Sequence, residues 1–153
     1  MNIKNKSSLI ISILIPIAVG TVSALLSGDI SNTAFNKPPL SPPSYIFPIV
    51  WTILYILMGI SSYIVYYSDS KYKEKAIIIY AIQLFFNFFW SIIFFRFDKY
   101  LLAFIWLIIL IVLIIIMIYQ FYKIKPLAAY LQIPYLLWCL FAAYLSLMVF
   151  LLN

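Results

Sequence analysis

The sequence predicts an all-α integral membrane protein: a single domain over residues 1–153 built as a bundle of five transmembrane helices. Hydrophobic residues make up 67% of the chain and charged residues only 9%, whereas a soluble domain carries about 25% charged residues. The mean hydropathy is +1.12. The apolar residues form five long runs that are separated by the charges. None of these runs alternates in polarity as a barrel strand would.

Each apolar run is long enough to cross a bilayer, since a membrane-spanning helix needs roughly 20 residues. The last three connections are short, so successive helices should be antiparallel neighbours. The fourth run carries few polar residues, which is typical of a filler helix or a lipid-facing wall. The predicted helices cover residues 9–27, 45–67, 76–95, 101–122 and 127–152.

The first run allows two interpretations. Lys4 and Lys6 before it, and the sequence VSA at residues 22–24, are typical of a secretory signal peptide. However, the run is longer than the signal-peptide core of about 7 to 15 residues. Small residues also line one helical face, which favours a retained helix that packs closely against its neighbours. These small residues are Gly20, Ser23, Ala24 and Ser27.

The basic residues are divided unequally between the two sides of the predicted bundle. Seven lie at the amino terminus and in the second and fourth loops: Lys4, Lys6, Lys71, Lys73, Lys75, Lys123 and Lys125. Three lie in the first and third loops: Lys37, Arg96 and Lys99. The positive-inside rule therefore predicts a cytoplasmic amino terminus and an external Asn153. The net charge of +6 is read as this topology signal, and no nucleic-acid partner is expected.

The first loop, residues 28–44, is predicted to be a proline-rich lid. Proline fixes φ and lacks an N–H donor, so KPPLSPPS at residues 37–44 cannot be helical and forms a stiff, extended segment. A simple linker is the alternative. A structured lid is favoured because Tyr45, Phe47 and Trp51 follow at once, and because long ordered loops are usually functional. The lid would then face outward.

Three predicted helices carry aromatic and polar residues on one face. An amide that faces lipid is costly, so the face with Gln83 and Asn87 should point inward. The alternative is an interfacial aromatic belt, which fits the tyrosines beside the loops better than Trp90 and Trp138. The predicted inward faces are Gln83, Asn87, Trp90, Ser91 and Phe94; Pro134, Trp138, Phe141, Ala142, Leu145 and Ser146; and Phe47, Trp51, Tyr55, Met58 and Ser62.

The composition excludes several kinds of chemistry. The chain has no histidine, which removes the commonest metal ligand and general base. Its one cysteine, Cys139, cannot form an intrachain disulfide. No charged residue lies inside a predicted span, so ion coupling and a proton relay are not expected. No metal site and no required cofactor are expected either.

Three segments stand out: KPPLSPPSYIFPIVWTILYILMG, QLFFNFFWSIIFF and KPLAAYLQIPYLLWCLFAAYLS. They resemble the translocator protein family, which is also called tryptophan-rich sensory protein or peripheral benzodiazepine receptor. The resemblance implies five tightly packed helices, commonly paired as a homodimer, with a ligand pocket under the lid. The family binds porphyrins, isoquinoline carboxamides and benzodiazepine-type drugs, and cholesterol in animals. The implied pocket residues are Trp51, Asn87, Trp90, Trp138 and Ala142, with Phe47 and Leu145 nearby; the helix faces add Ser91.

The resemblance suggests two functional hypotheses, a binding protein and an enzyme. A third hypothesis, a structural protein, is considered beside them. The first is binding, sensing or transport of tetrapyrroles such as protoporphyrin IX in a bacterial-type cell membrane. The second is light-dependent degradation of protoporphyrin, with the porphyrin as substrate and Trp51 and Trp138 as the catalytic residues. The third, a structural subunit without a small ligand, is disfavoured by the convergent aromatic faces. A cholesterol motif at Tyr144 lacks the basic residue that such motifs require.

Overall fold

The bundle consists of five membrane-spanning stretches of helix. The computed structural model describes residues 3–30 and 34–153. Within that part of the chain, five stretches are long and apolar enough to cross a membrane, which confirms the predicted fold class. The helices are α1 (Lys6–Ser27), α2 (Ile46–Tyr66), α3 (Lys73–Ser91), the π-helix η2 (Ile92–Arg96), α4 (Tyr100–Ile124), α5 (Pro126–Tyr130) and α6 (Ile133–Leu152).

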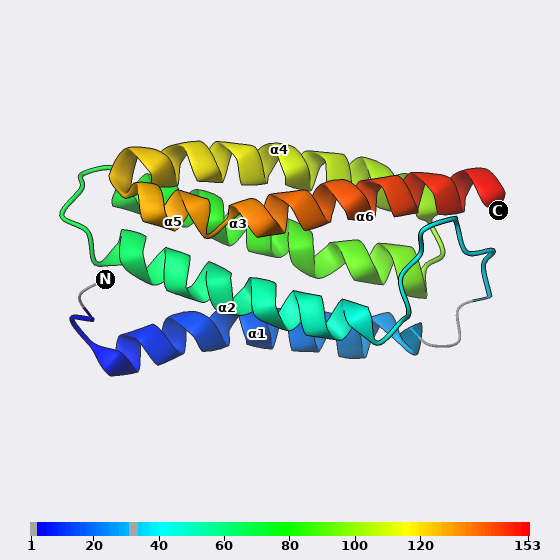
Figure 1. Cartoon of the computed structure of the whole chain (residues 1–153), viewed down its shortest axis with the longest axis horizontal. Helices are drawn as coiled ribbons and strands as arrows, with labels where there is room; N and C mark the ends of the chain where they lie inside the picture. Colours follow the sequence, from blue (N-terminus) through cyan, green and yellow to red (C-terminus); the bar gives the residue numbers. More distant parts are fainter. Residues whose placement is uncertain (1–2, 31–33) are drawn as a thin grey trace.

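The helices pack into one bundle. Following the contacts between elements, α1 lies against α2, α2 against α5, α5 and α6 against α4, α4 against α3, and α3 against both α1 and α2 (Figure 1). The fourth helix, predicted as filler or a lipid-facing wall, has one face in the core, where Leu107, Ile114 and Met117 are fully buried. Its other face is exposed and would meet lipid.

The last span is interrupted, whereas the sequence predicted one continuous helix over residues 127–152. The chain turns at Leu131 and Gln132 between α5 and α6. Pro134 lies at the start of α6. Its ring nitrogen cannot donate to the carbonyl four residues earlier, and the ring crowds that carbonyl, so a helix stops and restarts there.

The third span ends in a π-helical turn that the sequence did not predict. The backbone N–H of Phe97 donates to the carbonyl of Ile92 at 3.2 Å, a bond across five residues. Such turns insert one residue into a helix and are frequent at functional sites. This turn lies at the same end of the bundle as the lid.

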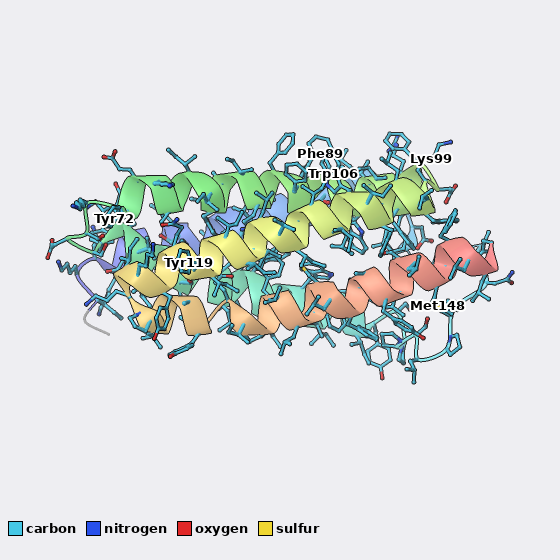
Figure 2. All side chains as sticks on the ribbon, turned by 90° about the horizontal axis from the view of Figure 1, so that it is seen from above. Tyr72, Phe89, Lys99, Trp106, Tyr119 and Met148 are labelled. Carbon is cyan, nitrogen blue, oxygen red and sulfur yellow. The ribbon has the colours of Figure 1, made fainter. Side chains whose placement is uncertain are left out.

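The two ends of the bundle differ in what they carry. The start of α1 and the α2–α3 loop lie at one end, and the carboxyl terminus and the described part of the lid loop (residues 28–30 and 34–44) lie at the other (Figure 1). Tyr72 and Tyr119 mark the first end and Lys99 the second (Figure 2). Tyr72 and Tyr119 are exposed, and Lys123 Nζ lies 4.2 Å from the ring centroid of Tyr119. This arrangement is typical of residues at a membrane–water interface.

Helix α1 packs on α2 through glycine. A Cβ atom added at Gly59 would collide with the backbone of Ile13, and one added at Gly20 would collide with the ring of Tyr55. Small residues allow this close approach, which drives helix association in lipid. The small face of α1 is therefore used inside the subunit.

We predict that Gly59→Ala destabilises the bundle by about 1 to 3 kcal/mol, because the methyl group forces two backbones apart. Thermal unfolding in detergent measures the effect. Ala18→Val, on the exposed face of α1, is the control and should leave the melting temperature unchanged. An unchanged melting temperature in Gly59→Ala would show that α1 and α2 do not meet at this glycine.

We also predict that the lid end is external. Cys139 is fully buried, so a membrane-impermeant thiol reagent should not label it in intact cells. A cysteine added after Asn153 in a Cys139→Ala background should label without lysis. Labelling that requires lysis would place the lid end in the cytoplasm and reverse the orientation.

Candidate ligand-binding site

The lid loop is attached to the end of the bundle at several points. The ring of Phe35 makes edge contacts with Phe94 and Tyr100, at centroid distances of 5.6 and 5.8 Å. The Asn36 backbone N–H donates to Asn153 Oδ1 at 2.9 Å. The Tyr144 hydroxyl donates to the carbonyl of Pro39 at 3.2 Å. These contacts favour a structured cap over a loose linker.

Under this cap lies a small cavity of about 70 Å³, called the lid cavity here. Its walls come from the lid loop, the lid ends of α2 and α6, and the α3–η2 junction. Pro38 is buried in the loop side of the wall. The lining residues are Ile30, Phe35, Lys37, Pro38, Ser41, Pro42, Ser44, Phe47, Trp90, Phe94, Phe95, Ala142, Leu145, Ser146 and Val149.

A larger cavity of about 560 Å³ lies beside it, between α1, α2 and α3; we call it the α1–α2 cavity. It begins at Tyr55, where the contact with Gly20 brings α1 and α2 together, and extends toward the lid. Phe47 and Trp90 line both cavities. The two cavities are therefore neighbours that share an aromatic wall.

The predicted site residues are distributed over both cavities. Ala142 and Leu145 line the lid cavity, Trp51, Asn87 and Ser91 line the α1–α2 cavity, and Phe47 and Trp90 line both. Trp138 lines neither, but its ring packs against Phe47 at 5.8 Å.

The two tryptophans proposed as a catalytic pair have different surroundings. The Trp51 ring stacks on Tyr55 at 5.5 Å and lies 6.5 Å from Trp90. The Trp138 ring contacts Phe47 and Phe141. Trp51 thus lines the α1–α2 cavity directly, whereas Trp138 packs behind Phe47, which lines both cavities.

A chain of hydrogen bonds crosses the centre of the bundle at the floor of the α1–α2 cavity. The Tyr55 hydroxyl donates to Asn87 Oδ1 at 2.8 Å, and Asn87 Nδ2 donates to the Tyr135 hydroxyl at 3.0 Å. The Tyr135 hydroxyl donates in turn to Gln83 Oε1 at 2.8 Å. Asn87 therefore joins α2 to α6 from its place on α3.

Ser91 has a similar role toward α1. Its hydroxyl lies 2.7 Å from Ser23 Oγ and accepts a hydrogen bond from Ser27 Oγ at 2.9 Å. Ser23 Oγ also donates to the carbonyl of Phe88 at 2.6 Å. These contacts tie the small face of α1 to the last turn of α3, beside the start of η2.

Several buried polar atoms near the cavities have no hydrogen-bond partner within the described part of the chain. They include Trp90 Nε1 and Ser146 Oγ, both on residues that line the lid cavity, and Trp138 Nε1. A buried donor without an acceptor is costly. Of these three atoms, only those of Trp90 and Ser146 belong to residues that line a cavity.

The inward face predicted for α6 was partly wrong. Pro134 is exposed, whereas Ala142, Leu145 and Ser146 of the predicted face are buried. The other buried positions of α6 are Tyr135, Cys139, Ala143 and Val149. Aligning the face on Pro134 and Trp138 displaced its first half by one position from the buried Tyr135 and Cys139. Tyr135, which binds Asn87, was missed for this reason.

The lining of the two cavities is mainly apolar and aromatic. Among residues 3–30 and 34–153, no three His, Cys, Asp or Glu side chains come together to hold a metal ion. The site consists of indole, phenyl and phenol rings, small residues and a few polar groups.

The chain is similar to known membrane proteins over most of its length. The sequence model of the TspO/MBR family matches residues 12–152. Tryptophan-rich protein TspO of Archaeoglobus fulgidus is 34% identical, covering 97% of this chain and 99% of that protein. The tryptophan-rich protein TspO of Chlorobaculum tepidum is 33% identical, covering 79% and 78%. Human translocator protein is 33% identical, covering 72% and 68%.

We predict that Asn87 and Tyr55 are energetically coupled even without ligand. Asn87→Leu leaves the buried Tyr55 hydroxyl without an acceptor, so it should destabilise the protein more than Tyr55→Phe does. Because the double variant loses their hydrogen bond only once, the cycle should show a coupling of about 1 kcal/mol. Thermal or denaturant unfolding of the four proteins measures this coupling. Strictly additive effects would show that the bond contributes nothing to stability.

Proposed function

Because this chain belongs to the TspO/MBR family, we propose that it binds flat, apolar tetrapyrroles such as protoporphyrin IX in the adjoining lid and α1–α2 cavities. The same cavities would accept isoquinoline carboxamide and benzodiazepine-type ligands. The protein would act in tetrapyrrole sensing or transport at a cell membrane. Its five spans make it a multi-pass membrane protein.

The observation that supports this proposal is the pair of aromatic-walled cavities beneath the lid. The α1–α2 cavity alone, at about 560 Å³, falls within the range of about 300 to 1,000 Å³ typical of small-molecule sites. Trp51, Trp90 and Phe47 line its walls. Flat ring systems gain about 0.5 to 1.5 kcal/mol per aromatic contact beyond simple burial.

The prolines of the lid loop contribute by reducing the entropy lost on binding. Pro38 and Pro42 line the lid cavity directly, and their fixed φ angles limit the shapes that the loop can adopt. A loop that is already close to its bound shape loses less conformational freedom when a ligand enters. Deleting Pro42 and Pro43 should therefore weaken binding.

The second proposed function is light-driven oxidation of bound protoporphyrin. The contacts of Trp51 with Tyr55 and Trp90 favour it, since they place several oxidisable rings together beside the cavity. The excited porphyrin would be the photosensitiser and dioxygen the oxidant, adding both of its oxygen atoms across one double bond of the ring, with Trp51 and Trp138 as the electron or oxygen partners. The protein's part would be to hold the ligand and the indoles close together.

One experiment tests both functions. The parent protein, Trp51→Phe and Trp138→Phe are titrated with protoporphyrin in the dark and then followed by absorption under illumination. Phenylalanine keeps a stacking surface but is harder to oxidise, so we expect dark binding within a few-fold of the parent and loss of most light-driven decay. Trp106→Phe is the matched control, because Trp106 lines neither cavity and donates to the Phe86 carbonyl.

The outcomes separate the two functions. A spectral shift in the dark with no decay in light would leave binding alone. Decay at the parent rate in both Phe variants would make the indoles packing residues and remove the enzymatic proposal. The absence of any spectral shift in the parent protein would contradict tetrapyrrole binding itself.

Pairing of two copies belongs to the same proposal. Gly20, Ser23 and Ser27 on α1 already contact Tyr55, Phe88 and Ser91 of their own subunit. The homodimer would therefore form through another surface.

A further inference from the structure

Three buried polar side chains lie in the half of the bundle away from the lid, and each has atoms without a hydrogen-bond partner. Within residues 3–30 and 34–153, these atoms are the Tyr80 hydroxyl, Gln83 Nε2, and both Nε2 and Oε1 of Gln132. Gln83 and Gln132 are fully buried, and Tyr80 is only 6% exposed. None of the three residues lines the lid cavity or the α1–α2 cavity.

The register of α3 against α6 brings these side chains to one place. Both helices run from the end where α1 starts to the lid end (Figure 1). The hydrogen bond from the Tyr135 hydroxyl on α6 to Gln83 Oε1 on α3, at 2.8 Å, sets their register. Residues three positions apart share one helix face. One turn earlier, Gln132 and Tyr80 therefore stand opposite each other.

Small side chains leave room beside these groups. The preceding turn of both helix faces carries alanine, Ala76 on α3 and Ala128 on α5, and each is fully buried. On α2, Ser62 lies beside Tyr80 and donates its proton to the carbonyl of Gly59 at 3.0 Å. The space between the two faces is thus bordered by polar atoms and by small residues.

We propose that Tyr80, Gln83 and Gln132 form a binding site for buried water, called the water site here. The unpaired atoms include the amide donors of both glutamines, the acceptor Gln132 Oε1, and a hydroxyl that can act as either. Water both donates and accepts, whereas an ion of either sign would satisfy only some of these atoms. A buried water typically makes about three hydrogen bonds to protein groups. The water site offers one for each side chain.

The water site also orients the hydrogen bonds that end at the α1–α2 cavity. Gln83 Oε1 accepts from the Tyr135 hydroxyl, whose oxygen accepts from Asn87 Nδ2. If the Gln83 amide turned over, it would present a donor to Tyr135 and reverse this order. An acceptor for Gln83 Nε2 in the water site prevents that. Asn87 lines the α1–α2 cavity, so the water site holds a cavity residue in place from a distance, whatever ligand the cavity takes.

The chain allows a direct test, because Gln83, Gln120 and Gln132 are its only glutamines. Labelling the glutamine amides with nitrogen-15 gives one NMR signal pair for each, assigned by its loss in the matching methionine variant. Through-space transfer of magnetisation from water, as distinct from chemical exchange, is measured for the full chain in detergent. We expect transfer to the amides of Gln83 and Gln132, although both are fully buried, and loss of most of the transfer at Gln83 in Gln132→Met.

Thermal unfolding gives an independent measurement. Tyr80→Phe and Gln132→Met remove polar atoms and keep the shape of the side chain, so each should lower the melting temperature by about 2 to 4 °C. The double variant should fall little further, because both side chains bind the same water. Gln120→Met is the matched control, since Gln120 is half-buried on α4; its effect should add in full to that of Tyr80→Phe.

Three results would overturn the water site. A melting temperature that rises in Tyr80→Phe and in Gln132→Met would show that their polar atoms are unpaired in the folded protein. Strictly additive effects of these two substitutions would show that the side chains share no water. Coupling between them without transfer from water to either buried amide would show that the side chains bond directly to each other.

Discussion

The hydrogen-bonded chain from Tyr55 through Asn87 and Tyr135 to Gln83 holds the centre of this bundle together. In a bilayer, apolar surface gives helices little reason to prefer one another over lipid, so packing and buried hydrogen bonds decide their arrangement. Asn87 uses both ends of its amide, accepting from α2 and donating to α6. The chain thereby fixes the positions of three helices around one side chain.

This central chain also sets where the protein can be hollow. On its amino-terminal side the glycines bring α1 and α2 into direct contact. On its lid side the α1–α2 cavity lies between the same helices and is lined by the rings of Phe47, Trp51 and Trp90. The lid loop then covers an end of the bundle that the helices alone would leave open. The hydrogen bonds of Asn87 thus lie below the cavities, and Pro38 and Pro42 of the lid loop lie above them.

The sequence was sufficient for the class of fold because the lengths of the apolar runs match the thickness of a membrane. The sequence also predicted that Phe47, Trp51, Asn87 and Trp90 face the interior, because an amide or a large indole that faces lipid is costly. All four residues line the α1–α2 cavity. It could not show that Asn87 is already bonded to two tyrosines, because partners on other helices depend on how those helices are rotated. A one-position error on α6 was enough to hide Tyr135.

The π-turn η2 makes the third span sensitive to changes in chain length. Its bond from Phe97 to Ile92 accommodates one residue more than an α-helical turn would, and with this extra residue Phe94 and Phe95 both line the lid cavity. Losing a single residue here would restore an α-helical turn and leave the chain beyond it in nearly the same orientation, because the π-turn already absorbs its extra residue within one turn. What a deletion would remove is the extra residue itself, so Phe94 and Phe95 could no longer both line the lid cavity as they do now.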